Sequence, residues 1–260
     1  MKNKPKILFY DIETMPLKAY IWRLGKQVVR HQQLGKNHFM YNIICITYCW
    51  NDNKPAKALV FDYKKQDCKK IVQEFDELVK QADCVIGKNS DRFDNKHISL
   101  QRLVHDLPGM PDWLDKCDDL EKHMRRHFYL PSQSLDYISD ILGFGGKIKM
   151  EMQDWINITE KNEFGPKSLK KMVTYGKKDI VDTRAVWNYC VKHFKPRLNF
   201  ATFAGDHVCV RCGSSNIYKN GTRYAGKSRK QRWQCNDCHS FAGYTIINYK
   251  YVDKKPKLGG

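Results

Sequence analysis

The sequence Lys6-Ile-Leu-Phe-Tyr-Asp11-Ile-Glu13 is a short run of apolar and aromatic residues that ends in two carboxylates. Such a run is typical of a buried β-strand. Because residues i and i+2 of a strand face the same side, Asp11 and Glu13 project together from its end. Neighbouring carboxylates repel each other unless a cation lies between them, so the pair is a candidate site for a divalent metal ion. The pattern D-x-E is common, and alone it predicts no more than a solvated strand end.

The segments that follow alternate between strand and helix patterns. Residues 117–194 are predicted to be mostly helical, most clearly over 134–142 and 168–194. Alternating strands and helices favour an α/β layered fold. Before residue 117, the patterns predict strands over 43–50, 58–63 and 84–87 and helices over 68–81 and 93–107.

Two further acidic residues lie at positions that suit a shared site. Asp94 opens the helix predicted after the strand that ends at Gly87, where a carboxylate also interacts favourably with the helix dipole. Tyr175 and Asp179 are four residues apart and therefore share one face of a helix. Gly176 lies between them and is predicted to interrupt that helix, because glycine in a helix costs about 1 kcal/mol relative to alanine.

Together the three segments resemble, in order and spacing, the motifs of the DEDD superfamily of 3′–5′ exonucleases. Asp11-Ile-Glu13-Thr14 resembles the first motif, and Asn89 through Phe93-Asp94 resembles the second. Tyr175-x-x-x-Asp179 resembles the third motif in its tyrosine form. The histidine form requires a His five residues before the aspartate, where this chain has Thr174. The resemblance covers about residues 5–194 and extends to predicted phage and bacterial exonucleases.

The resemblance implies a ribonuclease H-like mixed sheet flanked by helices, and a metal-dependent enzyme that releases nucleoside 5′-monophosphates. The four carboxylates would hold two Mg²⁺ or Mn²⁺ ions, which suit hard oxygen ligands, with Asp11 bridging them. Tyr175 would position the water or the scissile phosphate. Thr14 and Asn89 are predicted to contact nucleic acid. The implied catalytic residues are Asp11, Glu13, Asp94, Tyr175 and Asp179.

Four of the ten cysteines form two pairs, Cys209-Val-Arg-Cys212 and Cys235-Asn-Asp-Cys238. Two CxxC pairs at this separation predict a tetrahedral Zn²⁺ site, and four protein ligands make the zinc structural. Gly213 supplies the tight turn after the first pair. Disulfides are not expected, because the N-terminus does not resemble a secretory signal. The segment resembles the zinc ribbons of transposases and transcription factors, so we expect a small C-terminal four-cysteine zinc ribbon.

Between the cysteine pairs, basic and aromatic residues alternate along a predicted hairpin, 217–224 and 227–233. Lys and Arg can contact phosphates, and Tyr224 or Trp233 can stack on unpaired bases. The aromatic residues can equally form the small core of the ribbon, and a ribbon that binds protein remains open. The predicted contacts with nucleic acid are Arg223, Tyr224, Lys227, Arg229, Lys230 and Arg232.

The chain has 46 Lys and Arg against 28 Asp and Glu, a net charge of +18. An excess this large favours a nucleic-acid partner. The resemblance to phage and bacterial exonucleases favours DNA over RNA. Residues 205–260 alone carry eleven Lys and Arg against three Asp. The hydrophobic content of 42% excludes a disordered chain. No apolar run reaches the roughly 18 residues that suggest a membrane span, and we expect a cytoplasmic protein without a membrane partner.

The expected organisation is an exonuclease domain over 1–194, a linker over 195–206, and a zinc ribbon with a basic tail over 207–260. The expected function is a two-metal-ion 3′–5′ exonuclease whose ribbon assists substrate binding. Two alternatives remain open: a non-catalytic adaptor that binds nucleic acid, and a structure-selective endonuclease on the same fold.

Overall fold

The computed structural model describes residues 5–35, 41–52, 54–109, 111–145, 148–197, 199, 201–204, 207–225 and 228–247. The chain divides into two compact units. The α/β unit is formed by Pro5–Cys190 with Pro196 and Arg197, and the C-terminal unit by Val191–Lys195 and the described residues from Asn199 onward. No helix in the described part of the chain is both long and apolar enough to cross a bilayer.

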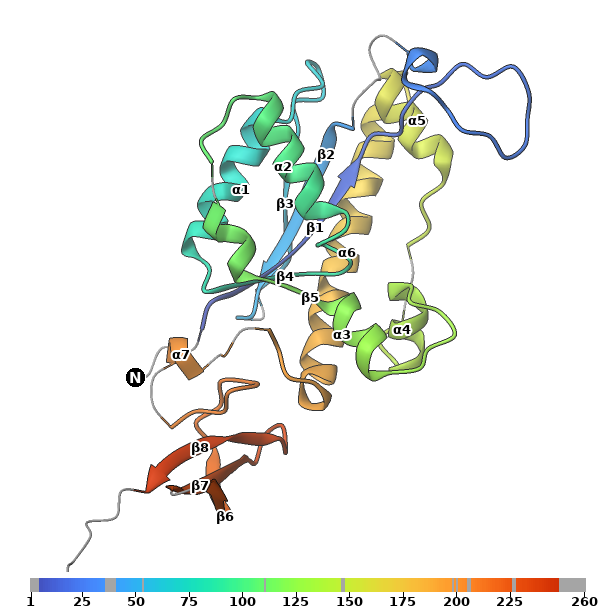
Figure 1. Ribbon diagram of the computed structural model, residues 1–260. Helices are drawn as coiled ribbons and strands as arrows, with labels where there is room; N and C mark the ends of the chain where they lie inside the picture. Colours follow the sequence, from blue (N-terminus) through green and yellow to red (C-terminus); the bar gives the residue numbers. More distant parts are fainter. Residues whose placement is uncertain are drawn as a thin grey trace, which may run out of the picture. The chain divides into compact units, whose positions relative to one another are not determined.

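The α/β unit is built on a five-stranded mixed sheet in the order β3-β2-β1-β4-β5 (Figure 1). The central strand β1 (Ile7–Thr14) is antiparallel to β2 (Ile43–Trp50), which is antiparallel to β3 (Lys57–Val60). On its other side β1 is parallel to β4 (Cys84–Gly87), and β4 is parallel to β5 (Cys117–Asp119). The predicted α/β fold with a mixed sheet is confirmed.

Helices cover both faces of this sheet, which explains why β1 and β2 are apolar on both sides. On one face lie α1 (Lys69–Gln81) and α2 (Asp94–Val104), and on the other lies α6 (Gly165–Cys190) with α5 (Met152–Glu160) packed on it. The stripe Ile71, Val72, Phe75 and Val79 buries α1 against the sheet. The remaining helices of this unit are η1 (His31–Gln33), η2 (Pro111–Lys116), α3 (Leu120–His127) and α4 (Leu135–Ile141).

The prediction that residues 117–194 are mostly helical is wrong at their start, where β5 forms the edge of the sheet. Cys117-Asp-Asp119 lacks the β-branched residues that indicate a strand. Its two acidic side chains are buried, and each has polar partners. Asp118 accepts hydrogen bonds from the backbone N–H of Arg197 (2.7 Å) and contacts His123, and Asp119 is the N-cap of α3.

The predicted interruption at Gly176 is also wrong, because α6 is one continuous helix of 26 residues. Gly176 is buried against β2, and a Cβ atom built on it would lie 2.7 Å from Thr47 Cγ2. Thr47 is the β2 residue paired with Asp11. The glycine therefore lets α6 approach the sheet beside the strand that carries the first motif.

The C-terminal unit contains a three-stranded antiparallel sheet in the order β6-β7-β8. The predicted hairpin is β6 (Ile217–Ala225) and β7 (Ser228–Cys235); β8 (Phe241–Ile247) was not predicted. A glycine inside β8, Gly243 at φ 142°, obscures its strand pattern. The unit also contains η3 (Val191–His193) and α7 (Ala201–Ala204), the latter inside the predicted linker.

We predict that Gly176→Ala destabilises the α/β unit although it improves helix propensity. The added methyl group overlaps Thr47, and overpacking of this kind typically costs about 1–3 kcal/mol, against a propensity gain of about 1 kcal/mol. Thr47→Ser removes the overlapping methyl group. In a double-mutant cycle followed by urea unfolding, Thr47→Ser should therefore recover most of the loss. Additive effects of the two changes would contradict this packing explanation.

Candidate functional site

A cavity of about 300 Å³, here called the cleft, opens beside the end of β1. The residues that line it lie far apart in the sequence. Two acids come from β1, one acid comes from the start of α2, and a tyrosine and an acid come from α6. All five predicted catalytic residues line it. Thr14 is not among the lining residues, although it ends the same strand. The lining residues are Asp11, Ile12, Glu13, Lys88, Asn89, Phe93, Asp94, Leu135, Tyr175, Asp179 and Thr183.

The position of Asp94 depends on the edge of β1. The parallel pairing with β4 ends at Phe9, so the following residues of β1 have no strand partner on that side. There the backbone N–H of Ile12 donates to Asp94 Oδ1 at 3.0 Å. The next residue of α2, Asn95, accepts a hydrogen bond from the buried hydroxyl of Tyr10. These two contacts fix the first turn of α2 against the strand that carries Asp11 and Glu13.

Asn89 reaches the cleft from a loop that is organised by Asp119. The residue adopts a left-handed backbone conformation, with φ 59°. The Asp119 carboxylate accepts the backbone N–H groups of Asn89 (2.9 Å), Asp91 (3.2 Å) and Glu121 (2.9 Å). The sequence analysis missed this role of Asp119, and the available indication was its place directly before a helix, where Asp is a preferred cap.

The opposite wall of the cleft comes from α6, together with Leu135 of α4. The Tyr175 phenol and the Asp179 carboxylate, one helical turn apart on α6, interact, which raises the pKa of Tyr175 and opposes the rise in the pKa of Asp179. An interaction with Trp155 of α5 lowers the pKa of Glu13, against the larger effect of burial. Trp155 was not predicted as a site residue, because nothing in its local sequence distinguishes it from a core tryptophan.

The carboxyl groups of the cleft have raised pKa values, and burial is the largest cause in each case. Burial and the nearby Asp179 raise the pKa of Asp11 to about 7. Burial with Asp11 and Asp179 raises the pKa of Glu13 to about 8, and burial raises that of Asp179 to about 6. The pKa of Asp94 is also raised, by burial and by Asp11. These raised pKa values show that the four carboxyl groups are poorly stabilised by their surroundings when all of them are ionised.

Lys88 is a cation in the wall of this acidic cleft. Its charge lowers the pKa of Asp11, opposing the effect of burial. Its ammonium group also forms an ion pair with Glu121 at 2.8 Å, and Glu121 in turn pairs with Arg125. Lys88 is therefore shared between the cleft and α3, and it offsets only part of the negative charge.

The second predicted metal site brings its four cysteines together. The sulfur atoms of Cys209, Cys212, Cys235 and Cys238 all lie within 4.8 Å of one another, with 3.6 Å between Cys209 and Cys238 and 3.7 Å between Cys212 and Cys235. A tetrahedral site with Zn–S bonds of about 2.3 Å requires sulfur atoms about 3.8 Å apart. The cluster therefore fits one zinc ion. No three acidic side chains of the cleft bring their oxygens within 4.8 Å of one another, so that group is more open.

The predicted nucleic-acid contacts of the ribbon fall on both faces of its sheet. Trp233 packs against the cysteine cluster and donates its indole N–H to Thr245 Oγ1 at 3.0 Å, which favours the core interpretation for this residue. Tyr224 is exposed and lies beneath the Arg229 guanidinium, 5.8 Å from ring centroid to Cζ. Lys227 lies outside the described residues. The other predicted contacts, Arg223, Lys230 and Arg232, alternate with these along the hairpin.

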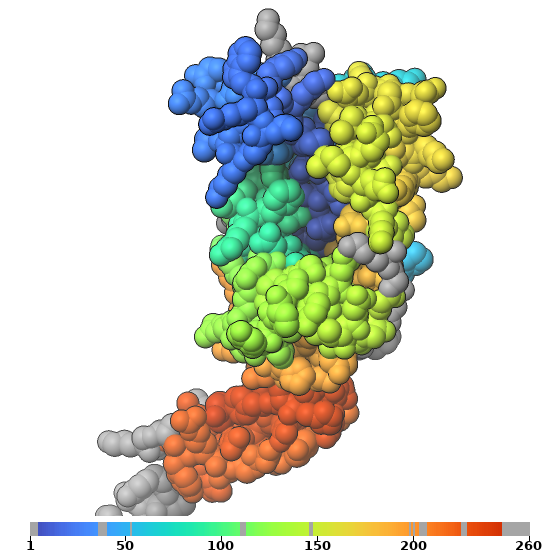
Figure 2. Space-filling view, turned by 90° about the vertical axis from the view of Figure 1, so that its right-hand side faces the viewer, coloured from blue at the N-terminus to red at the C-terminus, as the bar shows by residue number. Residues whose placement is uncertain are grey.

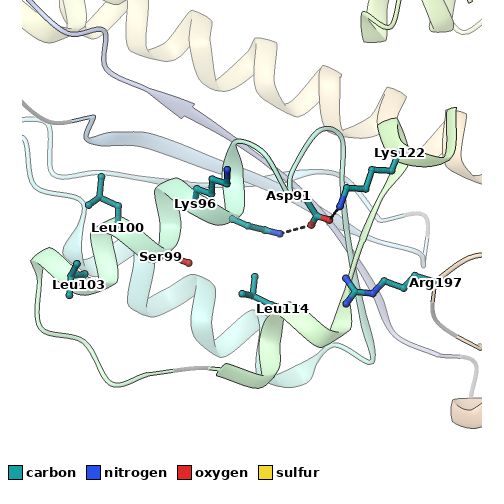
Figure 3. A pocket seen from close by; sticks show the side chains of 9 residues that line it. Asp91, Lys96, Ser99, Leu100, Leu103, Leu114, Lys122 and Arg197 are labelled. Carbon is teal, nitrogen blue, oxygen red and sulfur yellow. Dashed lines mark hydrogen bonds and ion pairs between the residues drawn. The ribbon is translucent and has the colours of Figure 1, made fainter. Parts of the chain in front are cut away.

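A larger cavity of about 680 Å³ is lined by residues of α2, Leu114, Lys122 and Arg197 (Figure 3). Asp91 points into it rather than into the cleft. There it accepts a hydrogen bond from Asn95 Nδ2 (3.0 Å) and forms an ion pair with Lys122. Of the two aspartates in the second motif segment, only Asp94 therefore belongs to the acidic cleft.

No family model and no curated protein matches this chain. Among solved structures, the chain is similar to a family B DNA polymerase from the hyperthermophilic archaeon Pyrobaculum calidifontis, with 13% sequence identity and a TM-score of 0.49. The similarity covers 86% of this chain and 32% of the polymerase, so the chain spans about a third of that protein's length. A likeness at this level says nothing of the activity of the present chain.

We predict that the α/β unit, in buffer free of divalent cations, loses stability as the pH rises from about 5 to about 9. Asp11, Glu13 and Asp179 bind protons more tightly in the folded protein than in the unfolded chain, where carboxyl pKa values are near 4. Their favourable contribution is complete below the unfolded pKa and disappears as the pH passes the folded values.

Asp11→Asn removes one of these charges and serves as the matched comparison. By calorimetry, the thermal midpoint of the wild type should fall relative to that of Asp11→Asn across this pH range. A difference between the two proteins that does not change with pH would contradict the charge repulsion described here.

We also predict that one zinc ion per chain survives extensive dialysis against buffer without chelator, because four thiolates bind zinc tightly. Cys212→Ser should lower the zinc content measured by atomic absorption and lower the stability of the C-terminal unit. Cys49→Ala is the control, since Cys49 is a buried thiol of β2 in the other unit. A full zinc content in Cys212→Ser would exclude this site.

Proposed function

We propose that the protein is a metal-dependent 3′–5′ exonuclease of the tyrosine-type DEDD group, with a ribonuclease H-like catalytic domain. The observation that carries the proposal is the cleft itself. Five residues from three distant motifs, Asp11, Glu13, Asp94, Tyr175 and Asp179, line one cavity of about 300 Å³. The mixed sheet, with β1 at its centre and helices on both faces, supports the same fold family.

The acidic residues of the cleft suit a pair of divalent cations. Buried carboxylates with raised pKa values gain most from a bound cation, and Mg²⁺ and Mn²⁺ prefer oxygen ligands. With four carboxylates and two ions, one ion would take three carboxylate ligands, whose oxygens would lie within about 4.2 Å of one another. No three acidic side chains of the cleft bring their oxygens within 4.8 Å of one another, so the ions would draw these carboxylates closer together. Asp11 would bridge the ions, with Glu13, Asp94 and Asp179 completing their shells.

The chemistry that such a pair of ions supplies is activation of a water for attack and stabilisation of charge on the leaving 3′ oxygen. Burial and the Asp179 carboxylate raise the pKa of Tyr175, so its phenol stays protonated and can orient a water or a phosphate oxygen by hydrogen bonding. Lys88 supplies a positive charge in the wall of the cleft for the phosphate. The small volume of the cleft favours one terminal nucleotide over a duplex, and so an exonuclease over an endonuclease.

The C-terminal unit is proposed to be a zinc ribbon that assists substrate binding through its basic hairpin. Its exposed side chains include Arg223, Tyr224 and Arg232. Cations and an exposed aromatic ring on one hairpin match the contacts that single-stranded nucleic acid requires, while the fold of the ribbon depends on the cysteine cluster.

We predict that Asp11→Asn and Asp179→Asn abolish cleavage of 5′-labelled oligonucleotides in Mg²⁺ or Mn²⁺ while binding is kept. Removing a carboxylate takes away a cation ligand and also lowers repulsion of the phosphates. Tyr175→Phe should slow single-turnover cleavage by roughly 10²-fold, because a positioned hydrogen-bonding group is lost. Glu74→Gln, an exposed acid on α1, should leave the rate unchanged.

The substrates should be matched single-stranded DNA and RNA oligonucleotides beside a covalently closed DNA circle. A ladder of products shortened from the 3′ end, with the circle intact, is the expected result. Cleavage of the circle would identify an endonuclease. Binding without cleavage by the wild type under all these conditions would identify the adaptor.

A further inference from the structure

The connection between β1 and β2 forms a projecting segment, residues 18–35, here called the finger (Figure 1). Its two ends are joined by backbone hydrogen bonds from Tyr20 to Gln33 (2.8 Å) and from Gly35 to Lys18 (2.8 Å), beside an antiparallel bridge between Ala19 and Leu34. The base of the finger is thus a defined structural element.

The outer part of the finger exposes large apolar side chains to an unusual degree. Trp22 is 99% exposed, Leu24 91%, Val28 88% and Tyr20 70%. A protein surface that presents such side chains together is usually a binding surface. Arg23 and Lys26 lie between them in the sequence, Arg30 follows, and all three are exposed as well. The sequence contains no Asp or Glu between Glu13 and Asp52, so the finger has a purely positive charge.

The base of the finger lies beside the cleft. It follows directly on β1, whose last residues include Asp11 and Glu13, and Lys18 forms an ion pair with Glu160 at the end of α5 (2.8 Å). Trp155, five residues earlier on α5, interacts with Glu13. Five residues span about 7.5 Å of helix, so the α5 residue that pairs with Lys18 and the α5 residue that interacts with Glu13 are about one and a half turns apart. Figure 2 shows dark blue β1 at the bottom of a groove between the blue segment that follows it and yellow α5.

We infer that the finger binds the unpaired strand of a nucleic acid whose 3′ end enters the cleft, with Trp22 stacked on a base and Arg23, Lys26 and Arg30 on phosphates. The inference rests on the proposed exonuclease function. Alternating exposed aromatic and basic side chains are the combination with which proteins bind single strands independently of sequence. A positive segment without acidic residues matches a polyphosphate chain better than it matches a protein surface of mixed charge.

The test is binding of a single-stranded oligonucleotide, with Ca²⁺ in place of Mg²⁺ to suppress cleavage. Trp22→Ala should weaken binding by roughly 5- to 150-fold, the range for loss of one base–aromatic stack, and Trp22→Phe should recover most of it. Because Trp22 is almost completely exposed, its replacement should not change the thermal midpoint of the protein.

The basic residues are tested by the salt dependence of the same binding. The triple variant Arg23→Ala, Lys26→Ala, Arg30→Ala should flatten the slope of log affinity against log salt by about 2, since each phosphate contact with a single strand contributes about 0.7. The matched control removes Lys69, Lys70 and Lys80, three exposed lysines of α1, and should change the slope much less. Unchanged affinity in Trp22→Ala, or equal slopes in the two triple variants, would overturn the inference.

A small phosphodiester separates this inference from the exonuclease proposal. The p-nitrophenyl ester of thymidine 5′-monophosphate can occupy the cleft but is too short to reach the finger. The finger variants should hydrolyse it at the wild-type rate in Mn²⁺ while losing oligonucleotide affinity. If the wild type hydrolyses neither this ester nor an oligonucleotide, the exonuclease proposal fails, whereas a loss of binding in Trp22→Ala would still support the finger as a nucleic-acid site.

Discussion

The last residues of β1 run past the end of their parallel neighbour, and this leaves a backbone edge that something other than a strand must satisfy. Asp94 does so by accepting the N–H of Ile12. Because Asp94 is also the first residue of α2, one hydrogen bond sets the start of that helix and brings a third carboxylate to Asp11 and Glu13. On the other face of the sheet, Gly176 lets α6 approach β2 closely enough to add Asp179 and Tyr175. The cleft lies where the start of α2 and the α6 residues Tyr175 and Asp179 come close to the end of β1.

Grouping buried acids in this way is unfavourable for folding, and the structure compensates for it only in part. Lys88 is a cation beside Asp11, yet it is shared with Glu121, while Trp155 and Tyr175 lower the pKa of a neighbouring carboxyl group only in part. The carboxyl pKa values consequently stay raised. Clusters of side chains that destabilise the folded state are characteristic of functional sites. The apolar residues of the surrounding sheet supply the stability that offsets this loss.

Short periodicities predicted the α/β fold, and the resemblance of three sequence motifs to those of an exonuclease superfamily predicted the residues that line the cleft. Asp11 and Glu13 follow the two-residue period of a strand, and Tyr175 and Asp179 follow the turn of a helix. Asp119 and Trp155 were not found, because their roles arise from contacts with segments 28 or more residues away. The prediction for Gly176 was wrong for the same reason. Local propensity disfavours glycine in a helix, but the close approach of Thr47 leaves no room for a side chain at this position.

The acidic cleft and the basic finger have opposite charges, so they affect the binding of a negatively charged nucleic acid in opposite ways. Under the proposed function, a cavity lined by four carboxylates and a single lysine would repel a phosphate chain until cations are bound, so most of the attraction for a nucleic acid would come from outside the cavity. The residues that follow β1 meet this requirement, since no acid occurs between Glu13 and Asp52 while Lys18, Arg23, Lys26 and Arg30 do. Under the proposed function these charges would contact the nucleic acid outside the cleft, so they would not add to the competition of Lys88 with bound cations for the same carboxylates. Under this proposal, affinity and chemistry would belong to adjacent but separate residues of the chain, with Glu13 as the last acid before the finger and Lys18 as the first cation of the finger.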